Sequence, residues 1–125
     1  MFFRKALLVI ILSVSAHILV AQILQPAKWT TAVSSDKVVV GSEIELIFRV
    51  SIDKDWYLYS SDFDPECGPM VTTFNFKPNT SYSLVGNIVP VNPLPKHDDV
   101  FDCDVKIFKK TAEFRQKIKI RTSRP

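Results

Sequence analysis

Residues 43–52, with the sequence EIELIFRVSI, give the clearest indication of fold class in this chain. Every second side chain from Ile44 to Ile52 is apolar, and most of the positions between them are polar or charged. A repeat of two is the spacing at which side chains leave the same face of a β-strand. The stretch therefore predicts a strand with one face in a core and the other in water.

A second strand with the same alternation is predicted at residues 111–120, TAEFRQKIKI. Shorter strands are predicted at residues 28–33, 37–40, 56–60, 72–77, 81–85 and 105–108, which are separated by turn-forming residues. Several short strands with one wet face each predict an all-β fold, an immunoglobulin-like antiparallel β-sandwich.

A proline-rich segment, residues 89–95 (VPVNPLP), interrupts this pattern. Proline lacks a backbone N–H and cannot donate to a ladder, so it favours extended, unpaired chain. We expect a stiff connection that leads into a loop at residues 97–104.

The first 21 residues have the features of a secretory signal peptide. Arg4 and Lys5 precede an apolar run from residue 6 to residue 20, and the small residue Ala21 follows. The alternative is an uncleaved anchor, because Leu19 is larger than a cleavage site prefers. Cleavage after Ala21 leaves residues 22–125 as a single domain with a formal charge of +1 instead of +3, which gives no general attraction to nucleic acid or anionic lipid.

The two cysteines, Cys67 and Cys103, have three interpretations that the sequence leaves open. In an exported protein they form a structural disulfide, remain two unpaired thiols, or act as a redox pair. Spacing alone does not show whether their Cα atoms come within bonding range. Neither belongs to a Cys-x-x-Cys motif, so nothing local indicates a lowered thiol pKa.

Tyrosines and acidic residues form the main candidate site. Alternation places Trp56 and Leu58 on the core face of a strand, and Tyr57 and Tyr59 on the other face, where they form one wall of a site. About forty residues later, the segment His97-Asp98-Asp99-Val100-Phe101 offers two carboxylates and an apolar cover.

Neither a metal nor another cofactor is expected. Residues 62–66 (DFDPE) space their acids as a calcium loop does, but they lack its glycine and its later glutamate, so a solvated turn is predicted. His97 is the only histidine after residue 21, which is too few for a zinc site, and we interpret it as a solvated loop residue.

The order of these motifs carries a resemblance to a known family. Asp53-x-Asp55-Trp-Tyr-Leu-Tyr59, Gly68-Pro69, Phe74-x-Phe76 and Asp98-Asp99-x-Phe101, ahead of an alternating strand around Phe114, resemble the amino-terminal periplasmic domain of the thiol:disulfide interchange protein DsbD. The resemblance runs from about residue 27 to residue 120. It implies an immunoglobulin-like fold in the periplasm. It also implies a relay of reducing equivalents from a membrane-embedded donor domain to periplasmic thiol-disulfide proteins, including disulfide isomerases and cytochrome c maturation factors.

The resemblance also assigns roles to the candidate site. It implies that Tyr57 and Tyr59 lie beside the active site, that Asp98 and Asp99 assist proton movement, and that Val100 and Phe101 form the cap that shields the reactive cysteines. Shielding matters because a thiolate must attack a disulfide, and an exposed reactive pair would lose electrons to the wrong oxidant.

The sequence departs from the family at its redox cysteines. The family's pair follows the last strand matched here, whereas this sequence ends at Pro125, and Cys67 and Cys103 do not align with that pair. We therefore expect a sandwich truncated before its last strands, a member of a protein-disulfide reductase family that is inactive by itself. The alternatives are a non-catalytic periplasmic protein-binding sandwich and a redox module that uses Cys67 and Cys103.

Overall fold

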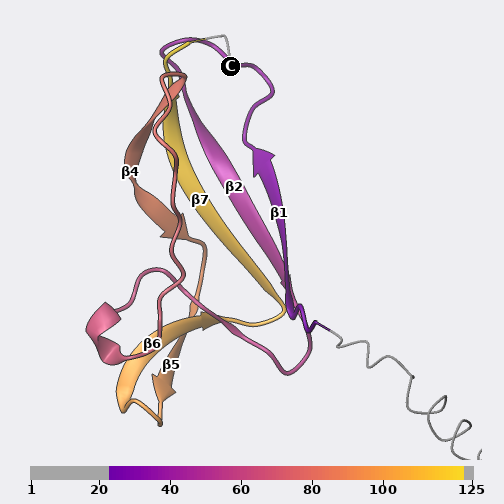
Figure 1. Ribbon diagram of the computed structural model, residues 1–125, viewed down its shortest axis with the longest axis vertical. Coiled ribbons are helices and arrows are strands. Elements are labelled where there is room, and N and C mark those ends of the chain that lie inside the picture. The colour runs from indigo at the N-terminus through magenta and orange to yellow at the C-terminus, as the bar shows by residue number, and fades with distance from the viewer. Residues whose placement is uncertain (1–22, 123–125) are drawn as a thin grey trace, which may run out of the picture.

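Seven strands and one short 3-10 helix form the part of the chain that the computed structural model describes, residues 23–122 (Figure 1). The predicted signal peptide, residues 1–21, lies outside the described residues. The elements are β1 (Ala27–Val33), β2 (Glu43–Ile52), β3 (Leu58–Tyr59), η1 (Pro65–Cys67), β4 (Tyr82–Pro90), β5 (Leu94–Asp98), β6 (Cys103–Phe108) and β7 (Thr111–Ile120).

The strands form two antiparallel sheets. One sheet has four strands in the order β1-β2-β7-β4, and the other has three in the order β3-β6-β5. The long strands β2 and β7 lie at the centre of the larger sheet, and β5 and β6 form a hairpin at one end of the molecule (Figure 1). This arrangement confirms the prediction of an all-β, immunoglobulin-like antiparallel sandwich.

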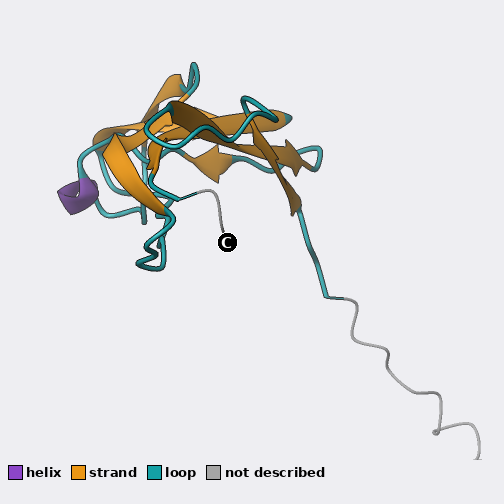
Figure 2. Cartoon of the chain, turned by 90° about the horizontal axis from the view of Figure 1, so that it is seen from above, coloured by secondary structure: helices purple, strands orange, loops and turns teal. Residues whose placement is uncertain are grey.

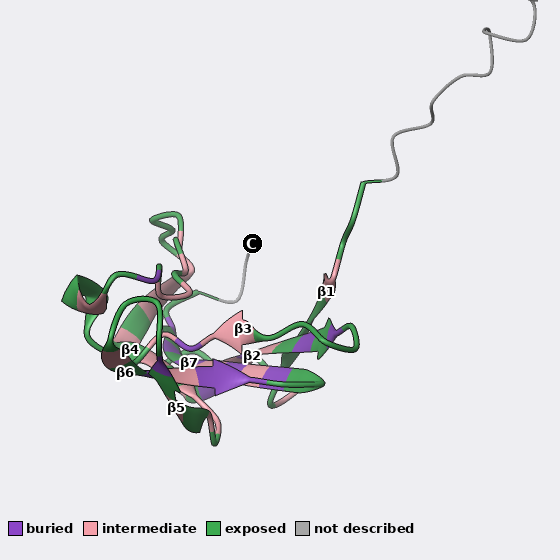
Figure 3. Cartoon of the chain, turned by 90° about the horizontal axis from the view of Figure 1, so that it is seen from below, coloured by how far each residue is buried: buried purple, intermediate pink, exposed green. Residues whose placement is uncertain are grey.

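The core lies where the small sheet and the segment before β4 cover the larger sheet. Phe114 of β7 is fully buried, and its ring lies 5.0 Å from the ring of Phe74 and 5.2 Å from that of Phe108, measured between centroids. Buried positions lie mainly on the strands (Figure 3). The main buried cluster consists of Val50, Ile52, Phe108, Ala112 and Phe114.

One buried position of β7 is polar. Gln116 lies on the same face as the apolar residues of this strand, and its side chain is fully buried. Its Nε2 donates hydrogen bonds to the carbonyl oxygens of Gly86, at 3.1 Å, and Lys117, at 2.9 Å. These bonds offset the cost of removing the amide from water.

The two strands with the clearest alternation, residues 43–52 and 111–120, have the predicted bounds. Two shorter predictions were wrong. Residues 37–40 form a loop ahead of a turn at Gly41, whose φ is +87°, and their valines are more than half exposed. Residues 72–77 form no strand, although the side chain of Phe74 packs on the core. β-Branched and aromatic composition indicates a half-buried surface, not a ladder partner.

The proline-rich segment was also predicted incorrectly in part. β4 extends to Pro90, and Leu94–Asp98 forms β5, in which Pro95 lies opposite Lys106 of β6. β5 is the edge of the three-stranded sheet, where a proline can turn its missing donor position away from the ladder. Residues 97 and 98 therefore belong to a hairpin instead of a free loop.

Candidate functional site

The tyrosines and the first carboxylate of the candidate site meet across the small sheet. Tyr59 lies on β3 and Asp98 at the end of β5, and both strands pair with β6, which runs between them. The hydroxyl of Tyr59 donates a hydrogen bond to Oδ2 of Asp98 at 3.0 Å. The hydroxyl of Tyr57 lies 3.4 Å from that of Tyr59, and their rings meet edge to face at 5.4 Å between centroids. The structure thus brings the two tyrosines together with an acid that lies about forty positions later in the sequence.

Asp98 braces the turn that carries the cap. Its Oδ1 accepts hydrogen bonds from the backbone N–H groups of Val100, at 3.0 Å, and Phe101, at 3.1 Å. The bond from the Phe101 N–H, helped by those from Tyr59 and Val100, lowers the pKa of Asp98 against the opposing effect of burial. Asp98 is therefore ionised at neutral pH and shapes the cap segment, which we define as Val100 and Phe101.

Tyr59 is held as a hydrogen-bond donor. Its hydrogen bond with Tyr57 raises its pKa most, followed by burial and by the carboxylate of Asp98. The phenol therefore stays protonated across the physiological range.

Asp99 differs from Asp98 because it is exposed. The cap segment next to it is also open to water, with 87% of Val100 and 48% of Phe101 exposed. The two acids to which one role was assigned from the sequence thus occupy different environments: Asp98 is bound into the hairpin, whereas Asp99 stands at its surface.

The exposed cap rests on a glycine. A β-carbon built on Gly68 would overlap the ring of Phe101, so the ring lies directly against the backbone of this residue. Gly68 also has a φ of +128°, which L side chains rarely adopt. Only glycine fits this position without displacing the cap.

A disulfide lies next to that contact. Cys67 and Cys103 are bonded, with their Cα atoms 5.8 Å apart, a distance typical of disulfides. The bond joins the end of η1 to the start of β6, and η1 projects at one end of the molecule (Figure 2). Asp98 is the register partner of Cys103, and directly opposite residues share one face of a ladder. The tyrosines, Asp98 and the cap segment therefore gather beside this disulfide, a proximity that no spacing in the sequence reveals.

His97 is bound more closely than a solvated loop residue. Its Nδ1 lies 2.9 Å from Oδ1 of Asp104, its register partner, and its Nε2 lies 3.1 Å from Oδ1 of Asp102. These carboxylates, Asp104 first, raise the pKa of His97. The alternation of acids at positions 102 and 104 is the sequence signal that could have indicated this arrangement within a hairpin.

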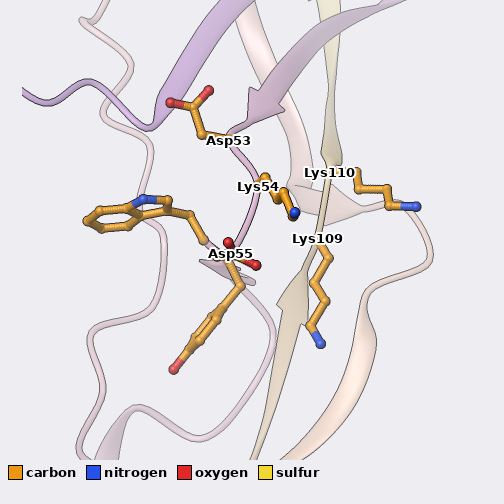
Figure 4. A pocket seen from close by; sticks show the side chains of 7 residues that line it. Asp53, Lys54, Asp55, Lys109 and Lys110 are labelled. Atoms are coloured by element: carbon orange, nitrogen blue, oxygen red, sulfur yellow. The ribbon is translucent and has the colours of Figure 1, made fainter.

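A hollow lies beside Tyr57. It is lined by Asp53, Lys54, Asp55, Trp56, Tyr57, Lys109 and Lys110 (Figure 4). The side chains of Lys109 and Lys110 extend in different directions from this hollow (Figure 4). Trp56, predicted to face the core, is half exposed because it precedes β3 and is not held in the ladder.

Across residues 23–122, no three metal-ligating side chains come together as a metal site would need.

The comparison with protein families agrees with this geometry. The family model described as "Thiol:disulfide interchange protein DsbD, N-terminal" matches residues 21–124. The chain belongs to this family. The resemblance drawn from the sequence motifs is thereby confirmed, and the N-terminal domains of DsbD are periplasmic. Searches of curated proteins and of solved structures gave no match. Within residues 23–122, no helix has the length and apolar character needed to cross a membrane.

Proposed function

We propose that this DsbD N-terminal domain, cleaved after residue 21, is the docking part of a periplasmic relay of reducing equivalents and that residues 22–125 alone are inactive. The relay takes reducing equivalents from a membrane-embedded dithiol donor and delivers them to periplasmic disulfide proteins. The observation that supports this most is the hydrogen-bonded assembly of Tyr57, Tyr59 and Asp98, in which Asp98 also binds the backbone of the exposed cap segment, in a chain of this family.

The cap segment is suited to be the part that a partner covers on docking. Val100 and Phe101 are exposed, so a partner that covers them removes apolar surface from water. Asp98 fixes the backbone of this segment in advance, which reduces the entropy lost on docking. Tyr57 and Tyr59 supply rigid aromatic surface at the edge of the same contact.

The reacting dithiol of the family is not provided by Cys67 and Cys103, which do not align with it. We therefore propose that residues 22–125 alone dock with partners and do not turn over disulfide substrates. The chain exported to the periplasm should show no catalysed reduction of insulin; robust turnover would contradict this assignment.

Partner capture tests the docking surface. A periplasmic disulfide isomerase and a membrane donor domain of this family are each titrated against the exported chain, and the dissociation constants of the wild type, Phe101→Ala and Tyr59→Ala are compared. Both substitutions should weaken capture severalfold, because they remove apolar contact area. Lys119→Ala, on the exposed face of β7, is the matched control and should leave the constants unchanged.

Two results would overturn the relay. One is that Phe101→Ala and Tyr59→Ala bind the partners with the same dissociation constants as the wild type. The other result has two parts. Partners whose cysteines are replaced by serine are captured as well as the wild-type partners, and a complete family member, which carries the redox pair, shows no thiol exchange with these partners. The latter result would establish the alternative, a non-catalytic binding sandwich.

A further inference from the structure

We propose that the Cys67–Cys103 disulfide is itself a site of thiol-disulfide exchange, a latch that a partner's dithiol reduces to release the cap segment. This inference rests on the proposed function, since it needs a dithiol partner that docks at the cap. It assigns to these two cysteines a role separate from that of the family's redox pair.

The disulfide joins two surface pieces. No residue of η1 is buried, and both cysteines are only half-buried, so a partner's thiolate can approach the bond. Two hydrogen bonds within the turn are local, from the N–H of Glu66 to Oδ1 of Asp64 and from the N–H of Cys67 to the carbonyl of Asp64. Both bonds stay within the turn. The chain just before the turn is also linked to β6 by the ion pair of Asp62 with Lys106, at 2.8 Å, but both side chains are partly exposed and such a pair stabilises little. The disulfide is therefore the main link of the turn to β6.

Both halves of the cap contact adjoin the latch. Gly68 directly follows Cys67 in the sequence. Phe101, whose ring lies against Gly68, is two residues before Cys103. When the disulfide is formed, it holds Gly68 and the ring of Phe101 together. Because Phe101 is still about half exposed, its contact with Gly68 buries little apolar surface and gives a weak attachment. Breaking the bond lets the turn and the hairpin separate.

The cap keeps its own shape when the latch opens. The hydrogen bonds that Asp98 accepts come from the N–H groups of Val100 and Phe101 and from the hydroxyl of Tyr59. None of these atoms belongs to the turn of η1. In the reduced state, the cap segment is therefore still ordered, but the ring of Phe101 no longer lies against Gly68.

The exchange takes place in two steps. A thiolate of the partner attacks one sulfur of the disulfide and forms a mixed disulfide, and the partner's second thiol then displaces the cysteine of this chain. The partner's dithiol is oxidised to a disulfide, while Cys67 and Cys103 become two thiols and take up two electrons and two protons.

The test follows two quantities in the exported chain. One is the rate at which a thioredoxin-type dithiol protein reduces Cys67–Cys103 under native conditions, measured by alkylation and mass spectrometry. The other is amide hydrogen exchange in residues 98–103, before and after reduction, with β7 as the internal reference.

We expect reduction under native conditions and severalfold faster exchange at residues 98–103, with β7 unchanged. Reduction by dithiothreitol, a small dithiol that needs no docking, should be faster in Phe101→Ala because the ring that rests against Gly68 is removed, whereas Lys119→Ala, on the exposed face of β7, should leave the rate unchanged. Cys67→Ser/Cys103→Ser should reproduce the exchange pattern of the reduced wild type.

A disulfide that the dithiol protein reduces only after unfolding would overturn the latch, and so would reduction without faster exchange at the cap. Partner capture separates this failure from that of the proposed function. Equal capture by the oxidised and reduced chain refutes the latch alone, whereas no capture by either form refutes the relay on which it rests.

Discussion

Removing the disulfide should destabilise the domain mainly through the unfolded chain. Cys67 and Cys103 are 36 residues apart in the sequence. For a loop of that length, chain-entropy theory gives a restriction of about 13 cal/mol/K, or about 3.8 kcal/mol at 25 °C. Few native contacts are lost with it, because neither sulfur lies in the main buried cluster. We therefore expect Cys67→Ser/Cys103→Ser to lower the free energy of unfolding by about 4 kcal/mol.

Urea unfolding followed by tryptophan fluorescence measures this loss. Trp29 stacks on the fully buried Phe114, with ring centroids 6.1 Å apart, so its emission reports on the core. For a urea slope of about 2 kcal/mol/M, the expected loss moves the midpoint down by about 2 M. Domains of this kind have unfolding free energies of about 5–15 kcal/mol, so the variant should remain folded without urea.

The reduced wild type is the control, and its midpoint should match that of the double serine variant. Equal midpoints for the oxidised wild type and the variant would refute the loop-entropy argument. A variant that is already unfolded without urea would refute the claim that the core is independent of the turn, and with it the latch.

Three further predictions concern single side chains. Gly68→Ala should lower the free energy of unfolding by about 1–3 kcal/mol, because it forces a β-carbon into the ring of Phe101. Gly41 also has a positive φ but no neighbour within 4 Å, so Gly41→Ala should lower the free energy of unfolding less in the same urea assay. Phe114→Ala should cost about 3–5 kcal/mol, because it empties a fully buried position, and an unchanged thermal midpoint would contradict this. The contribution of His97, whose folded pKa is raised, should be complete below about pH 6.5 and disappear as the pH rises through that pKa. Urea midpoints between pH 5 and 9 should show this loss in the wild type and not in His97→Gln.

Local alternation was sufficient to predict the two central strands and the sandwich. Residues 43–52 and 111–120 alternate because successive side chains of a strand leave opposite faces, a property of the backbone that needs no partner. Residues 37–40 and 72–77 have strand-like composition, yet they form no strand, because a ladder depends on what lies alongside.

The same distinction holds for the site. Tyr57, Tyr59, Asp98 and the cap segment could be named from motif order, since residue types and their order are written in the chain. Their chemistry could not. Whether Asp98 braces the cap segment or serves as a free acid depends on two hydrogen bonds within its own turn and on one from Tyr59 across the small sheet. Pairing of Cys67 with Cys103 depends on a Cα separation that follows from the docking of η1 on β6. Such distances between segments far apart in the chain arise only when the sheets pack, so the tertiary structure had to supply them.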